Sequence, residues 1–338
     1  MFARIRAEGL AAAVEVAGRL GLAGEPEVLS ERGNLLVRFG AVVARVATLT
    51  AHTRRHPEEW LARELAVATR VARRGGPVVA PLAEAGPHRA GGYVLTLWEY
   101  VEILPDRPDP ETAGRALARL HAAAAGVPGL PWLAAADRQT AEALERVPGA
   151  PAWLREEHAA VLAELRGSEP VVLHGDAHAG NLLLTPRGPL WTDLEETSLG
   201  PPEWDLATLA GSRFGPDRTG RNPAPDRDPP GPPADRTPAD RTSAEREPAD
   251  RRPDERTPVE PPVVGTPVVG TPARRALAAW AAESGRPLPT PEQFAPFRRA
   301  RELEGLAWLL AMAEVHPDRY RPLADRALAE REPPPRPR

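Results

Sequence analysis

Apolar residues follow two different periods along the chain, and the change of period predicts an α+β fold. Across residues 27–48, apolar and polar positions alternate in short runs, which predicts two or three strands with turns at residues 32–34 and at Gly40. The mostly apolar residues 92–102 predict a further, buried strand. From residue 109 onward, apolar positions recur every three or four residues, which indicates helices.

Proline and glycine mark where several of these helices begin and end. Pro57 begins one helix and Gly75 ends it, because proline suits the first helical turn and glycine suits the position after the last. Residues 1–20 predict an amphipathic helix and lack the apolar centre of a signal peptide. The other helices are expected at residues 109–125, 134–146, 152–166, 273–285 and 291–316. A strand-rich first third is thus followed by a helical part.

One stretch of the helical part does not have helical spacing. It reads VVLHGDAHAGNLLLTPRGPLWTDLEE and covers residues 171–196. The turn signal at residues 186–188 predicts a hairpin in which residues 182–185 pair with residues 189–192.

This hairpin brings polar side chains together. The pairing places Asn181 and Asp193 side by side at the open end, and Asp176 lies on the loop that enters the hairpin. An amide oxygen and a carboxylate are hard donors that suit Mg²⁺, which also keeps waters and phosphate oxygens in its shell. The sequence therefore predicts Asn181 and Asp193 as the candidate metal ligands.

Composition narrows the classes of partner. The 338 residues carry a net charge of −4, so no basic surface argues for a nucleic-acid partner. The absence of cysteine excludes disulfides and thiolate zinc sites, and no apolar run reaches the roughly 18 residues that cross a bilayer. Lysine is also absent, so any bound anion must meet arginine, histidine or a metal ion. We expect a soluble cytoplasmic protein without a membrane partner; the oligomeric state is left open.

A low-complexity segment interrupts the helical part. Residues 216–257 contain no Val, Ile, Leu, Met, Phe, Tyr or Trp and repeat PADR three times. Such a segment buries too little apolar surface to offset an ordering cost of about 1–2 kcal/mol per residue. We predict that residues 216–272 are a disordered insertion, and we favour a tolerated loop over a segment that binds a partner.

The motif H-G-D-x-H-x-x-N followed by D-x-E, which begins at His174, resembles the aminoglycoside phosphotransferase and choline kinase-like family. The resemblance implies a bilobal protein-kinase-like fold and transfer of the γ-phosphoryl group of ATP or GTP to a hydroxyl of a small molecule, with Mg²⁺ as cofactor. It implies Asp176 as the base, with His178 and Asn181 as the other catalytic residues. For His178 two roles are open: it neutralises the charge of the transferred phosphoryl group, or it only packs within the loop.

Residues of the first third are similar to the nucleotide-binding parts of the same family. Arg45 stands where the family's phosphate-contacting lysine is expected, and Glu64 is its natural ion partner. Residues near Glu99 and Val101 resemble the inter-lobe hinge that meets the adenine edge, and Asp205 resembles a brace of the catalytic loop. The loop SERGN is similar to the family's nucleotide-binding loop and contributes Ser30, Gly33 and Asn34.

The resemblance also divides the chain. It implies an N-lobe at residues 1–98, a C-lobe with the catalytic loop at 99–215, C-lobe helices at 273–330 after the insertion, and a disordered tail at 331–338.

Other interpretations of the same residues remain open. His174, Asp176 and His178 form H-x-D-x-H, which could ligate Zn²⁺ in a hydrolase, although no second histidine cluster follows. His174 is more simply a loop-fixing residue, and Glu195 faces either the metal or, as we favour, the solvent. Arginine in place of lysine allows a catalytically weak pseudokinase that only binds nucleotide. Tryptophans 60, 98, 191 and 204 are expected to serve packing.

Overall fold

The first third of the chain forms a five-stranded antiparallel sheet with strand order β1-β2-β3-β5-β4. The computed structural model describes residues 2–31, 33–49, 51, 54–214 and 271–331. The strands are β1 (Glu27–Ser30), β2 (Leu35–Phe39), β3 (Val42–Val46), β4 (His88–Ala90) and β5 (Tyr93–Glu99). Alternate residues of β2 are buried, because successive side chains point to opposite faces of a sheet.

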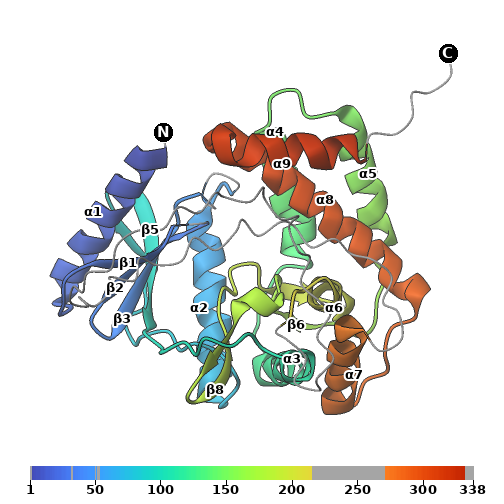
Figure 1. Ribbon diagram of the computed structural model, residues 1–338, viewed down its shortest axis with the longest axis horizontal. Helices are drawn as coiled ribbons and strands as arrows, with labels where there is room; N and C mark the ends of the chain where they lie inside the picture. Colours follow the sequence, from blue (N-terminus) through green and yellow to red (C-terminus); the bar gives the residue numbers. More distant parts are fainter. Residues whose placement is uncertain (1, 32, 50, 52–53, 215–270, 332–338) are drawn as a thin grey trace, which may run out of the picture. The chain divides into compact units, whose positions relative to one another are not determined.

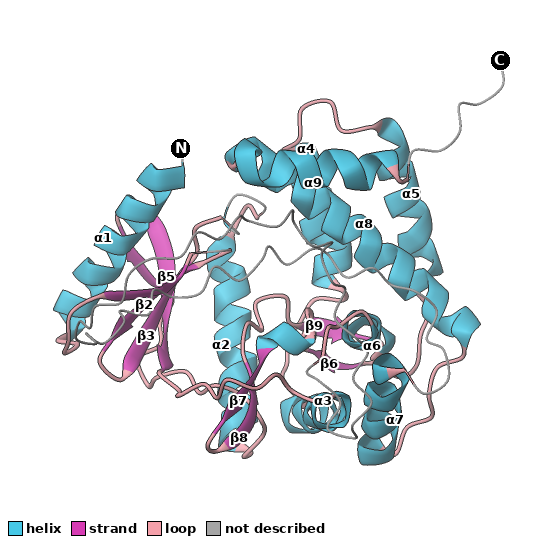
Figure 2. Cartoon of the chain, viewed as in Figure 1, coloured by secondary structure: helices cyan, strands magenta, loops and turns pink. Residues whose placement is uncertain are grey.

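Two helices accompany the sheet. Helix α1 (Phe2–Leu20) lies beside the sheet (Figure 2). Its apolar side chains, such as Ala13 and Val16, share a core with buried residues of β2 and β5. Helix α2 (Pro57–Arg73) contacts β5 and α3, and its buried face belongs to the core of the helical part. Helix α2 therefore links the sheet to the rest of the fold.

The rest of the fold is mainly helical, and its helices surround one apolar core (Figure 1). Helix α3 packs along α7, while α8 contacts α4, α5, α6 and α9. The elements are α3 (Pro110–Ala124), the π-helix η2 (Ala135–Gln139), α4 (Thr140–Glu145), α5 (Ala152–Glu164), α6 (Glu203–Ala210), α7 (Pro272–Ser284), α8 (Pro291–Val315) and α9 (Pro317–Ala329).

Two short ribbons lie within this helical part. Strands β7 (Leu182–Thr185) and β8 (Gly188–Trp191) form a hairpin at the predicted place, but β7 pairs with residues 188–191 rather than 189–192, because the turn takes only two residues. Strand β6 (Val171–Leu173) pairs with β9 (Ser198–Gly200), a pairing that the sequence did not predict because three-residue strands carry no clear period.

The predicted fold class, with a strand-rich N-lobe and a larger helical C-lobe, is confirmed. The predicted insertion lies outside the described residues except at its last two positions. There, Thr271 caps α7 through its side chain and Pro272 is the first residue of that helix. No helix in the described ranges is both long and apolar enough to cross a membrane.

Candidate functional site

The predicted catalytic loop runs from His174 to Asn181 and joins β6 to β7. Asp205 of α6, which is fully buried, holds its start by accepting the backbone N–H groups of His174 (2.7 Å) and Gly175 (2.9 Å). His121 of α3 donates to the same carboxylate at 2.9 Å. These contacts agree with the predicted role of Asp205 as a brace.

Gly175 is needed at its position in this loop. Its φ is +96°, and an added Cβ would lie 2.3 Å from the carbonyl oxygen of Glu196. The Gly175 carbonyl accepts hydrogen bonds from the Trp204 indole (2.8 Å) and from Arg301 (3.1 Å). The loop backbone is therefore fixed from both sides.

His174 supports the loop rather than a metal. Its Nε2 bonds the carbonyl of Thr192 at 3.1 Å, and its Nδ1 accepts the N–H of Asp176 at 3.3 Å. Burial lowers the pKa of His174 to about 4, so the ring is neutral at pH 7. Both ring nitrogens are engaged, and the described residues contain no cluster of three His, Cys, Asp or Glu residues that could hold a metal. These contacts argue against the zinc interpretation.

Asp176, the predicted base, lies between cationic and polar neighbours. Arg301 of α8 bonds its Oδ1 at 2.6 Å, and His178 Nε2 lies 3.5 Å from its Oδ2. Burial alone would raise the pKa of Asp176, but the nearby His178 and Arg301 lower it by a larger amount. The pKa therefore lies below its ordinary value. The carboxylate is therefore ionised at neutral pH, as a proton acceptor must be.

Asn181 and Asp193 flank the hairpin as predicted. The N–H of Thr192 donates to the carbonyl of Asn181 at 2.9 Å and continues the ladder beyond β7 and β8. The amide nitrogen of Asn181 donates to the Asp176 carbonyl at 2.9 Å, which leaves the amide oxygen available as a metal ligand. Asp193 has a left-handed φ of +66°, and its side chain is 42% exposed. An amide oxygen and a reachable carboxylate suit Mg²⁺.

Arg45 of β3 is buried at the centre of a carboxylate cluster. It contacts Glu64 of α2 at 2.5 Å and also pairs with Asp193 and Glu195. Burial alone would lower the pKa of Arg45, but the three carboxylates raise it above its ordinary value. Glu64 also accepts the N–H of Leu194 at 3.0 Å. The predicted Arg45–Glu64 ion pair is present, and Arg45 joins the sheet to the segment after β8.

The interpretation of Glu195 as solvent-facing is wrong. Its side chain is 8% exposed and accepts from Asn34 (2.9 Å), Arg45 and Arg54 (3.0 Å). Burial raises the pKa of Glu195, while Arg54 and Arg45 lower it below its ordinary value. The pairing was missed because these arginines lie some 140–150 positions away in the chain.

The predicted nucleotide-binding residues lie on the sheet and at its end. Ser30 ends β1, and the Gly33 carbonyl accepts the N–H of Leu49 at 3.0 Å, while Asn34 contacts Glu195 as described above. Glu99 ends β5, and Arg187 of the β7–β8 turn bonds its carboxylate at 3.0 Å. Beyond Val101, which is buried, the N–H of Leu104 bonds the carbonyl of Leu184 at 2.8 Å. The hinge-like segment therefore runs beside the hairpin.

A second group of charged residues was not predicted. Arg301 of α8 bonds Glu304 at 2.5 Å and Glu196 at 3.4 Å, and Gln139 of η2 donates to Glu196 at 2.7 Å. Burial raises the pKa of Glu304 to about 7, and burial together with Glu304 raises that of Glu196 well above its ordinary value. No motif marks Arg301 or Glu304, so only the packing of α8 against the catalytic loop reveals them.

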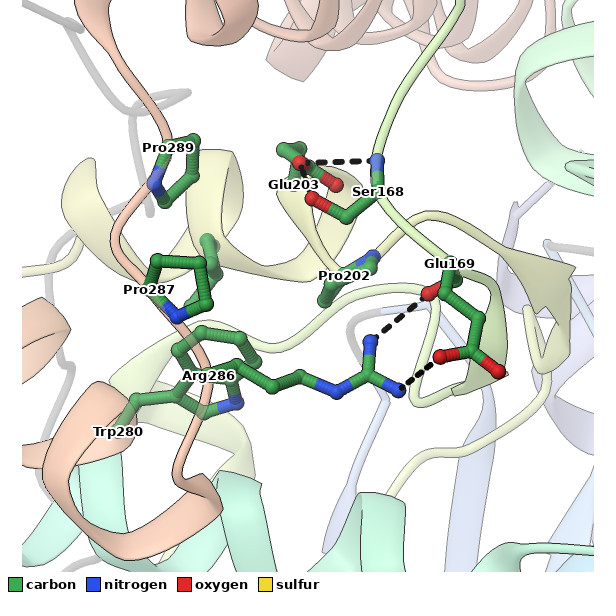
Figure 3. A pocket seen from close by; sticks show the side chains of 9 residues that line it. Ser168, Glu169, Pro202, Glu203, Trp280, Arg286, Pro287 and Pro289 are labelled. Atoms are coloured by element: carbon green, nitrogen blue, oxygen red, sulfur yellow. Dashed lines mark hydrogen bonds and ion pairs between the residues drawn. The ribbon is translucent and has the colours of Figure 1, made fainter.

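A separate cavity of about 200 Å³ contains none of the predicted site residues (Figure 3). It is lined by Trp280 and by prolines from the segments beside α6 and α7. Glu203 in its wall is already hydrogen-bonded to Ser168, at 3.1 Å from the Ser168 N–H. This cavity lies near the start of β6, whereas the catalytic loop follows the end of that strand.

Comparisons with known proteins agree with this geometry. The model of the phosphotransferase enzyme family matches residues 26–228. No curated protein sequence matches the chain.

Several solved structures share the fold. A choline/ethanolamine kinase family protein from Mesorhizobium loti is 19% identical with a TM-score of 0.53, and the match covers 98% of this chain and 93% of that one. Choline kinase LicA from Streptococcus pneumoniae is 14% identical with a TM-score of 0.55, covering 94% and 98%. Amicoumacin kinase hAmiN, solved with AMP-PNP and Ca²⁺, is 10% identical with a TM-score of 0.59, covering 98% and 97%. At these low sequence identities, the similarity shows that the fold is shared and no more.

Proposed function

Since the chain belongs to the phosphotransferase enzyme family, we propose that it is a small-molecule kinase that transfers the γ-phosphoryl group of ATP or GTP to a hydroxyl. The membership confirms the resemblance and the predicted enzyme class. The acceptor, the Mg²⁺ requirement, the role of each residue and a cytoplasmic location are parts of the proposal.

One observation carries the mechanism: Asp176 and the predicted metal ligands Asn181 and Asp193 lie around one end of the β7–β8 hairpin. Asp176 would orient the acceptor hydroxyl and accept its proton through Oδ2, because Arg301 holds Oδ1. Mg²⁺ held by Asn181 and Asp193 would offset the charge of the nucleotide phosphates.

The remaining residues would position the reactants. The sheet and the segment after Glu99 would bind the nucleotide, and Arg45, held by Glu64, would contact its phosphates. Arginine keeps its charge at this place and can bind phosphate through two N–H groups. His178, whose Nδ1 accepts the Gly180 N–H at 3.0 Å, keeps Nε2 directed toward Asp176 and the transferred group. The rate gain would come from positioning and charge stabilisation.

The test is the substitution Asp176→Asn in the full chain. Nucleoside diphosphate release should be measured across a broad panel of sugars, amino alcohols and other hydroxylated metabolites. For an acceptor that supports turnover, the variant should lose about 10²- to 10⁴-fold in kcat, because a general base contributes that much. Asp325→Asn, on the exposed face of α9, is the matched control. Undiminished turnover in Asp176→Asn would remove the proposed base.

A second candidate is a nucleotide-binding module without turnover. It is favoured by the contacts of Arg45, whose Nη2 bonds both Asp193 and Glu195 and so engages a proposed metal ligand. Thermal unfolding with MgATP and with MgGTP would report binding, and the acceptor panel would report turnover. Saturable stabilisation by nucleotide without diphosphate release from any acceptor would support the module.

A further inference from the structure

Basic side chains gather around Trp60 near the start of α2. The guanidinium carbons of Arg54 and Arg63 lie 4.4 Å and 4.5 Å from the centroid of the Trp60 ring. Arg138 of η2 reaches the same end of α2, where it pairs with Glu59 at 3.6 Å. Three guanidinium groups thus share a small region that the catalytic residues do not occupy.

Arg63 is the member of this group without a counter-ion. Its Nε and Nη2 are buried without a hydrogen-bond partner, and no carboxylate within the described ranges lies at ion-pair distance. The indole N–H of Trp60, which is 1% exposed, is also buried without a partner. Arg54, in contrast, bonds both Glu195 and Glu196. Unpartnered buried donors are costly, and here all three are donors that an anion could satisfy.

The charges around Arg63 also favour a bound anion. Burial, followed by repulsion from Arg138 and Arg54, lowers the pKa of Arg63 to about 10, and only Glu59 acts in the opposite direction. An anion beside Arg63 would relieve this repulsion. Arginine suits a phosphate group because its planar fork donates two parallel hydrogen bonds.

We propose that Arg63 and Arg138, with the indole N–H of Trp60, form a binding site for a phosphate group, either free phosphate or a phosphate carried by a small molecule. This site is distinct from the phosphate-contacting position at Arg45 and does not depend on the proposed function.

The proposed phosphate site is connected to the catalytic residues through Arg54 and α2. Arg63 precedes Glu64, which bonds Arg45, and Arg54 bonds Glu195, which also bonds Arg45. An anion that neutralises Arg63 would stabilise the start of α2 in the orientation that supports Arg45. Occupancy would therefore favour the arrangement of the site that the structure shows.

The experiment compares wild type, Arg63→Gln and Arg73→Gln in the full chain. Arg73 is exposed in the last turn of the same helix and is the matched control. Inorganic phosphate is titrated against chloride at equal ionic strength, and binding is followed by calorimetry and thermal unfolding. Glucose 6-phosphate and glucose form a second pair of probes that distinguishes free phosphate from a carried phosphate group.

Wild type and Arg73→Gln should show saturable binding of at least one phosphate probe, and Arg63→Gln should bind it at least tenfold more weakly. Without phosphate, Arg63→Gln should be only slightly less stable than Arg73→Gln, because Arg63 then has no hydrogen-bond or ion-pair partner in the described part of the chain and the variant loses only its stacking contact with Trp60. The proposal is overturned if neither probe binds wild type beyond chloride, if Arg63→Gln binds like wild type, or if Arg63→Gln is strongly destabilised in chloride alone.

Discussion

Two buried arginines organise the two sides of the candidate site, and they do so with different partners. Arg45 comes from the sheet and Arg301 from α8, and their side chains are 7% and 15% exposed. Each one faces three carboxyl groups: Glu64, Asp193 and Glu195 around Arg45, and Asp176, Glu196 and Glu304 around Arg301.

The two clusters differ in how deeply the arginine is buried and in which elements it joins. Arg54 contributes to both clusters, because it bonds Glu195 at 3.0 Å and Glu196 at 3.4 Å. Burial raises the pKa of one carboxyl group to about 7 in each cluster, Glu64 beside Arg45 and Glu304 beside Arg301, so neither cluster is balanced by arginine alone. Arg45 is more deeply buried than Arg301 and joins the sheet to the segment after β8, whereas Arg301 joins α8 to the catalytic loop within the helical part. The stability of the fold should therefore depend more on Arg45 than on Arg301.

The largest expected effect is the loss of stability in Arg45→Met. Removing one partner of a buried ion pair costs about 3–5 kcal/mol, because the remaining charges are buried without compensation. Arg301→Met should cost less, because the Arg301 side chain is 15% exposed and that of Arg45 only 7%, so water can better solvate the carboxyl groups that remain. The measurement is the free energy of unfolding in urea at pH 7.

Arg89→Met on the edge strand β4 is the control for this pair of variants. Its side chain is 68% exposed and pairs with Glu58 at 3.1 Å, so its loss should cost at most about 1 kcal/mol. Equal losses of unfolding free energy in Arg45→Met and Arg301→Met would contradict the proposed difference between the two clusters.

The two clusters also differ in how far the sequence could predict them. Asp193 was found because the hairpin turn places it near Asn181, whereas Arg45 and Glu64 were identified through the resemblance to the family and would otherwise have been taken as surface charges. Arg301 and Glu304 lie in α8, whose sequence pattern predicts a helix but not which residues its charged side chains contact. Their contacts with Asp176 and Glu196 span more than 100 positions, and no local signal encodes such a pairing.

The same reason explains the misjudged Glu195. A glutamate two positions after a metal ligand has no local partner, so exposure was the simpler expectation. Arg54 and Asn34 approach it only after the sheet and α2 have packed beside the hairpin. The strands β6 and β9 were missed for a related reason, since each gains stability from its partner rather than from its own sequence.

The raised pKa of Glu304 should make the stability of the fold depend on pH. Because the folded pKa of Glu304 is raised to about 7 from an ordinary 4.5, its contribution is fully present below about pH 4.5 and is lost as the pH rises through 7. The loss is at most roughly 3 kcal/mol. Glu304→Gln cannot ionise, so its stability advantage over wild type should grow from pH 5 to pH 8. Urea unfolding across this range measures it.

Glu314→Gln, exposed on the same helix, is the control for that series. Its difference from wild type should stay constant over the range. A constant difference for Glu304→Gln as well would assign the pH dependence to other carboxyl groups.

The smallest expected loss of stability comes from Trp204, an uncharged residue that contacts both Arg301 and the catalytic loop. The Trp204 indole donates to the Gly175 carbonyl at 2.8 Å, and Arg301 lies 5.0 Å from its ring centroid. Trp204→Phe keeps a ring beneath Arg301 but removes the hydrogen bond and some packing, which should cost about 1–2 kcal/mol. Trp308→Phe, which loses packing against Tyr320, is the control. If Trp204 positions Arg301 and the loop, its variant should lower kcat where Trp308→Phe does not, and equal kcat values would limit Trp204 to packing.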